Sequence, residues 1–167
     1  MNKPLRRAWV PALLWLAVIA WESTPLMSSE NTGHLLLAIA RFFDPQITLA
    51  QLQLLNGVGR KIGHCLGFGT LSLLMLRAWW ATLILPRSTT RLPSWTAMLT
   101  TWSARAAVLA LLSTAAVAGL DEWHQMLLPG RTGTIRDVAL DTTAAAFVQL
   151  VIVAARGLRG KQEAISN

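Results

Sequence analysis

The side chains best suited to chemistry lie in three short polar groups, each at the edge of an apolar stretch. The first group holds Lys61 and His64, which are three residues apart and share a face if the segment is helical. A lysine at a helix end is usually an interfacial anchor, whereas a histidine further into an apolar stretch needs a hydrogen-bonding partner. A structural role and a role in a site are therefore both open for these two residues.

The second group combines Asp121, Glu122 and Gln125 at the end of another apolar stretch. On a helix Asp121 and Gln125 lie one turn apart, which aligns a carboxylate with an amide. The Pro-Gly pair at 129–130 predicts a turn that directs Arg131 back over them. So many hydrogen-bonding side chains beside apolar sequence are unfavourable unless they satisfy one another or a ligand, which makes this group a candidate site.

The third group is Asp137 and Asp141, one helical turn apart at the start of the last apolar stretch. A carboxylate near a helix N-terminus interacts favourably with the helix dipole, and this structural role suffices for Asp137. Asp141 lies further in and requires a donor, for which Arg131, Lys61 and His64 are the candidates. We therefore expect a buried network of charged side chains that joins the three groups.

Metal and cofactor chemistry is not indicated by the local sequence. His64 and the neighbouring carboxylates are suitable ligand types, but the sequence has no HExxH motif and no His-x-x-x-His pair. It also has no Gly-rich phosphate loop, no nucleophile elbow and no dinucleotide fingerprint. We expect neither a metal site nor a cofactor, and a single cysteine, Cys65, excludes a disulfide within this sequence.

The elements that must position these groups are apolar on all sides. Of the 167 residues, 53% are hydrophobic and 14% are charged, and the mean hydropathy is +0.45. This is more apolar sequence than the core of one soluble domain buries. The alternative, a soluble bundle of buried helices, needs a polar stripe that the apolar stretches lack. We predict an all-α polytopic membrane protein, a single domain built as a four-helix transmembrane bundle with spans at about 8–27, 62–85, 106–120 and 138–155.

The distribution of basic residues predicts how the bundle is oriented. With the N-terminus in the cytoplasm, ten Lys and Arg fall on the cytoplasmic side and five on the outer side. We therefore expect a multi-pass protein of the plasma (inner) membrane with both termini cytoplasmic and the three polar groups facing outward. Lys3, Arg6 and Arg7 resemble the start of a signal peptide, but no small-residue cleavage site follows, so we expect a retained first helix. The formal net charge of +7 fits attraction to anionic lipid headgroups, and because the basic residues form no stripe, no nucleic-acid partner is expected.

The two long connections lead to different predictions. The outer loop at 28–60 contains apolar segments at 34–43 and 49–55, which predict one or two short helices at the membrane interface. The cytoplasmic connection at 86–93 is polar and is predicted to be a solvated linker.

One joint pattern runs through the polar groups. It is the run Asp121-Glu122-x-x-Gln125-x-x-x-Pro129-Gly130-Arg131-x-x-x-x-Arg136-Asp137-x-x-x-Asp141-Thr142, with Lys61-x-x-His64 upstream and Ser23-Thr24-Pro25 after the first span. This pattern resembles the VanZ-like family of small bacterial membrane proteins, whose namesake is the teicoplanin-resistance protein. The resemblance implies that the characteristic polar positions of that family are occupied here by Lys61, His64, Glu122, Gln125, Arg131 and Asp137. The chain departs from the family pattern at Arg60, where an acidic residue is frequent, and at Asp141, where asparagine is frequent. The resemblance further implies a link to glycopeptide resistance in the cell envelope, without a defined molecular activity.

The function expected from these features is binding. An outward-facing polar pocket would take a cell-wall precursor, a lipid headgroup, a glycopeptide-related ligand or an envelope protein, with Arg131 and Lys61 holding a phosphate or carboxylate while Glu122 and Gln125 orient it. The alternative is a membrane hydrolase or transferase that acts on a lipid-linked envelope substrate, with His64 or Glu122 as general base. A transporter is the third interpretation, although one copy of four helices without an internal repeat is small for that role. The expected partners are membrane lipids and an envelope precursor or protein, and the oligomeric state stays open.

Overall fold

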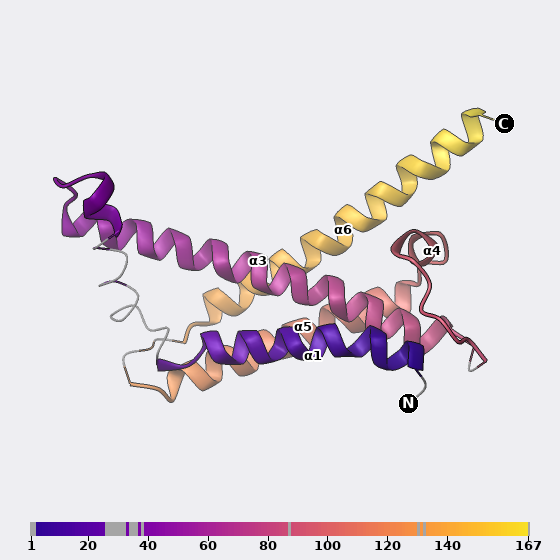
Figure 1. Ribbon diagram of the computed structural model, residues 1–167, viewed down its shortest axis with the longest axis horizontal. Helices are drawn as coiled ribbons and strands as arrows, with labels where there is room; N and C mark the ends of the chain where they lie inside the picture. The colour runs from indigo at the N-terminus through magenta and orange to yellow at the C-terminus, as the bar shows by residue number, and fades with distance from the viewer. Residues whose placement is uncertain are drawn as a thin grey trace.

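The fold is helical throughout the part of the chain that the computed structural model describes. That part comprises residues 3–25, 33, 37, 39–86, 88–129, 131 and 133–166, with only the backbone described for 159–166. Its helices, shown in Figure 1, are α1 (Lys3–Glu22), α3 (Leu49–Ile84), α4 (Trp95–Thr100), α5 (Ala104–Met126) and α6 (Ile135–Ser166). The predicted all-α class is therefore confirmed for these residues.

Helix α3 is the centre of the bundle, since α1, α5 and α6 all pack against it, and α5 also packs against α6 (Figure 1). Small residues line these contacts: Ala8, Ala12, Ala106 and Ala110 are each at most 1% exposed. Small side chains allow two helix backbones to approach closely, which is typical of helix packing in membranes.

Large apolar side chains cover the outside of the bundle as well as its inside. Those that are more than half exposed include Leu13, Leu66, Leu112, Phe147 and Leu150, which come from four different helices. An apolar outer surface on several helices is stable only in contact with lipid or another apolar partner. The surface therefore agrees with the membrane interpretation of the sequence.

Three helices are long and apolar enough to cross a membrane: α3, α5 and residues Ile135–Leu158 of α6. They contain the predicted spans at 62–85, 106–120 and 138–155, apart from one residue at the end of the first. Helix α1 does not meet the same criterion, so the predicted count of four spans is supported for three. The reason lies in its charges: Arg6 and Arg7 near its start and Glu22 at its end leave 14 uncharged residues between them, about 21 Å of helix against a hydrocarbon core of about 30 Å.

Helix α3 begins earlier than the apolar pattern predicts. Thr48 caps its N-terminus: the Thr48 hydroxyl accepts from the backbone N–H of Gln51, and the Gln51 side chain accepts from the backbone N–H of Thr48 at 2.9 Å. The segment at 49–55, predicted to contribute to one or two short interfacial helices, is thus the first part of α3. In the rest of the predicted loop residues 39–43 are helical, and most of 28–38 lies outside the described residues.

The connection from α3 to α5 has no helix among the described residues of 86–93, the segment predicted to be a linker, and is ordered after it. It contains the short helix α4, whose first turn is capped by the Ser94 hydroxyl. Arg77 of α3 donates to the carbonyl oxygen of Pro93 at 2.7 Å and lies over the Trp95 ring at 4.2 Å. These contacts attach α4 to the bundle.

Helices α3 and α6 run in the same direction, as two polar side-chain pairs that join them show. His64 contacts Asp141, and Ser72 accepts from the side-chain amide of Gln149 at 2.8 Å. Both pairs are 77 residues apart in the sequence, so two turns along one helix match two turns along the other. Parallel packing is what two helices that cross a membrane in the same direction require.

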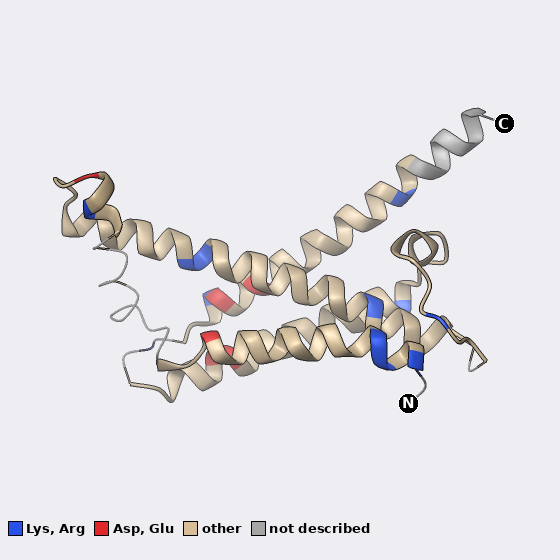
Figure 2. Ribbon diagram, viewed as in Figure 1, with Lys and Arg blue, Asp and Glu red and all other residues tan. Residues whose placement is uncertain are grey.

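Charge is distributed unequally between the two ends of the bundle. Figure 2 shows acidic residues gathered where the end of α1, the end of α5 and the start of α6 come together. Basic residues gather at the opposite end, around the start of α1. The candidate site lies at the acidic end.

Candidate functional site

A cavity of about 210 Å³ lies at the acidic end of the bundle. Its walls come from the end of α1, the middle of α3, the last turns of α5 and the segment that precedes α6. Its polar lining consists of Glu22, Ser23, Arg60, His64, Asp121, Gln125 and Arg131.

One side of the cavity is a buried network between α1 and α5. The Ser23 hydroxyl donates to Oδ1 of Asp121, and the Gln125 side chain donates to Oδ2 of Asp121 at 2.9 Å. Asp121 and Gln125 lie one helical turn apart on α5, as their spacing predicts. Because both oxygens of this carboxylate accept from neutral donors, Asp121 needs no cation as a partner.

Arg131 closes the cavity from the segment between α5 and α6. Its Nη2 donates to the backbone carbonyl oxygens of Glu22 and Thr24, at 2.7 Å each. These carbonyls belong to the C-terminal end of α1, where a cation interacts favourably with the helix dipole. Arg131 therefore reaches back across the cavity, as the turn at 129–130 predicts, although residue 130 itself lies outside the described part.

The charge of Arg131 has no acidic partner among the residues that the structure describes. No carboxylate lies within ion-pairing distance of it there, and its Nε is buried without a hydrogen-bond acceptor. Burial lowers the pKa of Arg131 and the positive charge of Arg60 lowers it further, while the charges of Asp121 and Glu122 partly offset this. Two cationic side chains thus face one cavity and repel each other.

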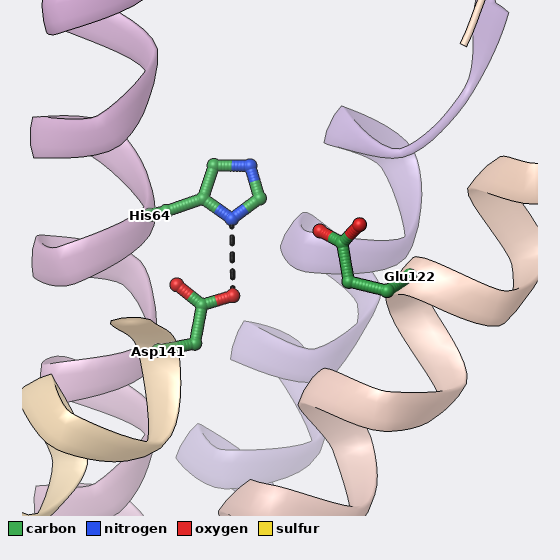
Figure 3. A group of neighbouring side chains, drawn as sticks. All are labelled: His64, Glu122 and Asp141. Atoms are coloured by element: carbon green, nitrogen blue, oxygen red, sulfur yellow. Dashed lines mark hydrogen bonds and ion pairs between the residues drawn. The ribbon is translucent and has the colours of Figure 1, made fainter. Parts of the chain in front are cut away.

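Below the cavity, three side chains from three helices face one another (Figure 3). Nδ1 of His64 lies 3.1 Å from Oδ2 of Asp141, whose side chain is fully buried. Glu122 is 3% exposed, and one of its oxygens accepts from the backbone N–H of Thr134 at 2.8 Å. His64 thus has the partner that its position in an apolar stretch requires.

Gly133 allows the segment before α6 to lie directly on α5. A Cβ atom at this position would overlap the backbone carbonyl oxygen of Glu122 and would lie 2.6 Å from Cγ of Met126. This close approach is what brings the Thr134 N–H to Glu122 and holds Arg131 over the cavity.

The structure brings six of the eight predicted site residues together and leaves out Asp137 and Lys61. His64, Asp121, Gln125 and Arg131 line one cavity, and Glu122 and Asp141 lie next to His64. Asp137 is hydrogen-bonded with Thr134 in the first turn of α6, which is a role at the start of a helix. Lys61 is exposed and is not part of the cavity lining.

Three polar residues of the cavity lining, Glu22, Ser23 and Arg60, were not singled out as site residues by sequence reasoning. Arg60 takes the place predicted for Lys61, and the signal for it was its spacing of four residues from His64. Ser23 was noted only as part of the resemblance, and no local pattern marks it as a partner of Asp121.

Comparison with known families agrees with this geometry. Residues 8–156 match the profile of the VanZ/LLP1 family. The chain belongs to the VanZ/LLP1 family. The resemblance carried by the polar motifs is thereby confirmed, and it identifies a membrane protein that the family name links to glycopeptide resistance. No curated protein and no solved structure matches the chain.

In this VanZ/LLP1 protein an apolar groove of about 430 Å³ adjoins the polar cavity. Ile19, Ser23 and Asp121 line both spaces. The remaining walls of the groove come from α1 and α5: Leu16, Ala20, Val117, Leu120 and His124. A polar space and an apolar space therefore meet at the end of α1.

Proposed function

We propose that this VanZ/LLP1 protein binds the phosphate-bearing headgroup of a membrane lipid in the outward-facing cavity. Lipid-linked cell-wall precursors and ordinary anionic phospholipids share this chemistry. The protein would lie in the plasma membrane with four crossings, including α1, and with both termini in the cytoplasm.

The observation that carries the proposal is the pair of cationic side chains at one cavity. Arg131 has no carboxylate partner among the described residues, and Arg60 repels it. A phosphate beside Arg131 would offset this repulsion and would accept charge-assisted hydrogen bonds from the Arg131 guanidinium group.

The groove beside the cavity supports a ligand with an apolar chain. Leu16, Ala20, Val117 and Leu120 offer an apolar surface that begins where the polar cavity ends. A phosphorylated lipid fits both spaces at once, with its headgroup beside Arg131 and its chain between α1 and α5. A small soluble anion would leave the groove empty.

The proposed orientation rests on the charge distribution. Basic residues gather at the end of the bundle opposite the cavity (Figure 2), and the positive-inside rule assigns that end to the cytoplasm. Replacement of Cys65 by Ala gives a background in which Arg136→Cys or Arg91→Cys introduces one exposed thiol at either end. A membrane-impermeant maleimide added to intact cells should label position 136 and not position 91; the reverse result would overturn the orientation.

Binding is tested with three probes on purified protein in detergent: a polyprenyl phosphate, phosphatidylglycerol and the matching uncharged polyprenol. We expect the polyprenyl phosphate to bind at least about tenfold more tightly than the polyprenol, because only the phosphate pairs with Arg131. Phosphatidylglycerol distinguishes the two lipid sources. If it binds as tightly as the polyprenyl phosphate, the site takes anionic phospholipids in general; if it binds more weakly, the ligand is a polyprenyl phosphate. Equal binding of the phosphate and the alcohol would refute the proposal.

Two substitutions locate the binding site. Arg131→Gln should weaken binding of the polyprenyl phosphate about tenfold, whereas Arg136→Gln, an exposed arginine nearby in the sequence, should leave it unchanged. Arg60→Gln serves as a second variant on the other side of the cavity. Binding that survives both cavity substitutions would contradict the assigned site.

The second candidate is a hydrolase or transferase that acts on the same lipid. It is favoured by the hydrogen-bond distance between His64 and the buried Asp141, because a carboxylate in this position orients an imidazole as a general base. Conversion of bound polyprenyl phosphate into a new species, lost in His64→Gln, would favour the enzyme over the binding protein.

A further inference from the structure

The cluster of His64, Glu122 and Asp141 has more buried acid than base. Asp141 is fully buried and Glu122 is 3% exposed, while the imidazole is the one basic group among the three (Figure 3). Two buried carboxylates that share one imidazole are unfavourable in a low-dielectric environment unless further positive charge is supplied.

A second observation points in the same direction. Oδ1 of Asp141 is buried and has no hydrogen-bond partner among the described residues. Buried carboxylate oxygens normally accept at least one hydrogen bond or bind a cation. This oxygen can therefore still accept a hydrogen bond or bind a cation inside the cluster.

The geometry of the cluster suits one metal ion. Two adjacent ligand atoms that each lie about 2.1 Å from an ion are separated by about 3.0–3.4 Å, and the Nδ1 of His64 lies 3.1 Å from Oδ2 of Asp141. One ligand atom from each of the three residues, including a Glu122 oxygen, lies within 4.8 Å of the others. A change in the side-chain torsions of Glu122 covers the remaining distance.

We propose that His64, Glu122 and Asp141 together bind one divalent transition-metal ion of the Zn²⁺ class. An imidazole among the ligands favours this class over Mg²⁺ and Ca²⁺, which take oxygen ligands. A divalent ion balances the two carboxylates, and if Asp141 binds it through both oxygens the ion also uses Oδ1, which has no other partner among the described residues. The site lies beside the cavity, because His64 also lines that space.

The sequence argued against a metal because it lacks the ligand spacings found within one helix. Such spacings are not required when the ligands come from different helices, and here α3, α5 and α6 each supply one residue. The metal site is independent of the lipid-binding proposal and would remain if the cavity bound no lipid.

The test measures metal binding by the full-length protein in detergent after treatment with a chelator. Zn²⁺, Co²⁺ and Mg²⁺ are added separately, bound metal is quantified by mass spectrometry of the washed protein, and Co²⁺ is also followed by its visible absorption. We expect one Zn²⁺ or Co²⁺ per chain, no stoichiometric Mg²⁺, and a rise in melting temperature on addition of Zn²⁺.

Matched substitutions assign the ligands. Asp141→Asn preserves the shape of the side chain, and His64→Gln provides a second variant if the first does not fold. Each should weaken Zn²⁺ binding by about a hundredfold or more, whereas His124→Gln, an exposed histidine on α5, should leave it unchanged. Protein without stoichiometric Zn²⁺ or Co²⁺, or Zn²⁺ affinity that survives both ligand substitutions, would overturn the proposal.

Discussion

The two ends of the bundle use arginine in similar ways but differ in what faces the guanidinium group. At the end near α4, Arg77 donates to a backbone carbonyl and is covered by the Trp95 ring at 4.2 Å. At the other end, Arg131 donates to two backbone carbonyls and faces a cavity of about 210 Å³. Each arginine leaves one buried nitrogen without a partner among the described residues, Nη1 in Arg77 and Nε in Arg131.

This difference separates a structural contact from a binding site. A tryptophan ring fills the space beside Arg77 and compensates the cation through its π electrons. A second pair, Arg156 and Trp102, repeats the arrangement at 5.0 Å on the same end, with Arg156 also donating to the Leu99 carbonyl. At the cavity end no aromatic ring among the described residues covers Arg131, so a ligand can supply the missing partner.

The largest effect on the cavity end is expected from Gly133→Ala. The added Cβ overlaps the Glu122 carbonyl oxygen and crowds Met126, so the segment that carries Arg131 must move away from α5. We expect a loss of about 2–3 kcal/mol in the free energy of unfolding and loss of lipid binding, measured by denaturant unfolding in detergent and by titration with the polyprenyl phosphate.

The control for this change is Gly119→Ala in helix α5, the helix on which the Gly133 segment packs. A Cβ at Gly119 meets no atom within 4 Å, and alanine is the better helix former by about 1 kcal/mol. Gly119→Ala should therefore be neutral or stabilising. Equal destabilisation by both substitutions would show that close packing of the segment at 131–134 is not what forms the cavity.

The next effect concerns the end near α4. Arg77→Gln removes the hydrogen bond to Pro93 and the contact with Trp95, and should lower the free energy of unfolding by about 2 kcal/mol. Arg91→Gln, an exposed arginine in the same connection, should change stability by less than about 0.5 kcal/mol. If Arg77→Gln has no larger effect than Arg91→Gln, this end is not the structural contact described above.

A smaller effect is expected from Ser23→Ala in the buried network of the cavity. The substitution removes the hydroxyl that donates to Asp121 and should cost about 1 kcal/mol, because the Gln125 amide still serves the other carboxylate oxygen. Thr143→Ala is the control, since that residue is exposed and its hydroxyl donates to the backbone carbonyl oxygen of Ala139 in its own helix. A thermal scan in detergent distinguishes the two, and equal melting temperatures for both variants would remove Ser23 from the network.

Much of the helical framework could be predicted from the sequence, because apolar length alone decides it. The three spans within α3, α5 and α6 follow from long apolar stretches with at most one charged residue each, and the Asp121–Gln125 hydrogen bond follows from one helical turn. The early start of α3 was missed because a capping box at Thr48 outweighs the weak periodicity of the segment after it. Local capping chemistry here decides where the helix begins.

The site itself could be predicted only in part. Arg60 lines the cavity and Lys61 does not, although the two are neighbours, because one residue along a helix turns the side chain by about 100°. Which of them faces the cavity depends on the rotation of α3 in the bundle, which packing of Phe68 and Leu71 determines. The cluster of His64, Glu122 and Asp141 needs three helices, and no local spacing encodes it.

The measurement that tests the central claim most directly compares Arg131→Gln with Arg77→Gln for both lipid affinity and thermal stability. The affinity for the polyprenyl phosphate should fall about tenfold in Arg131→Gln, which also lowers the melting temperature because two hydrogen bonds to the end of α1 are lost. Arg77→Gln should lower the melting temperature by a similar amount and keep the affinity of the unmodified protein. If affinity falls in proportion to melting temperature in both variants, Arg131 is a structural contact like Arg77, and the cavity is not a lipid-binding site.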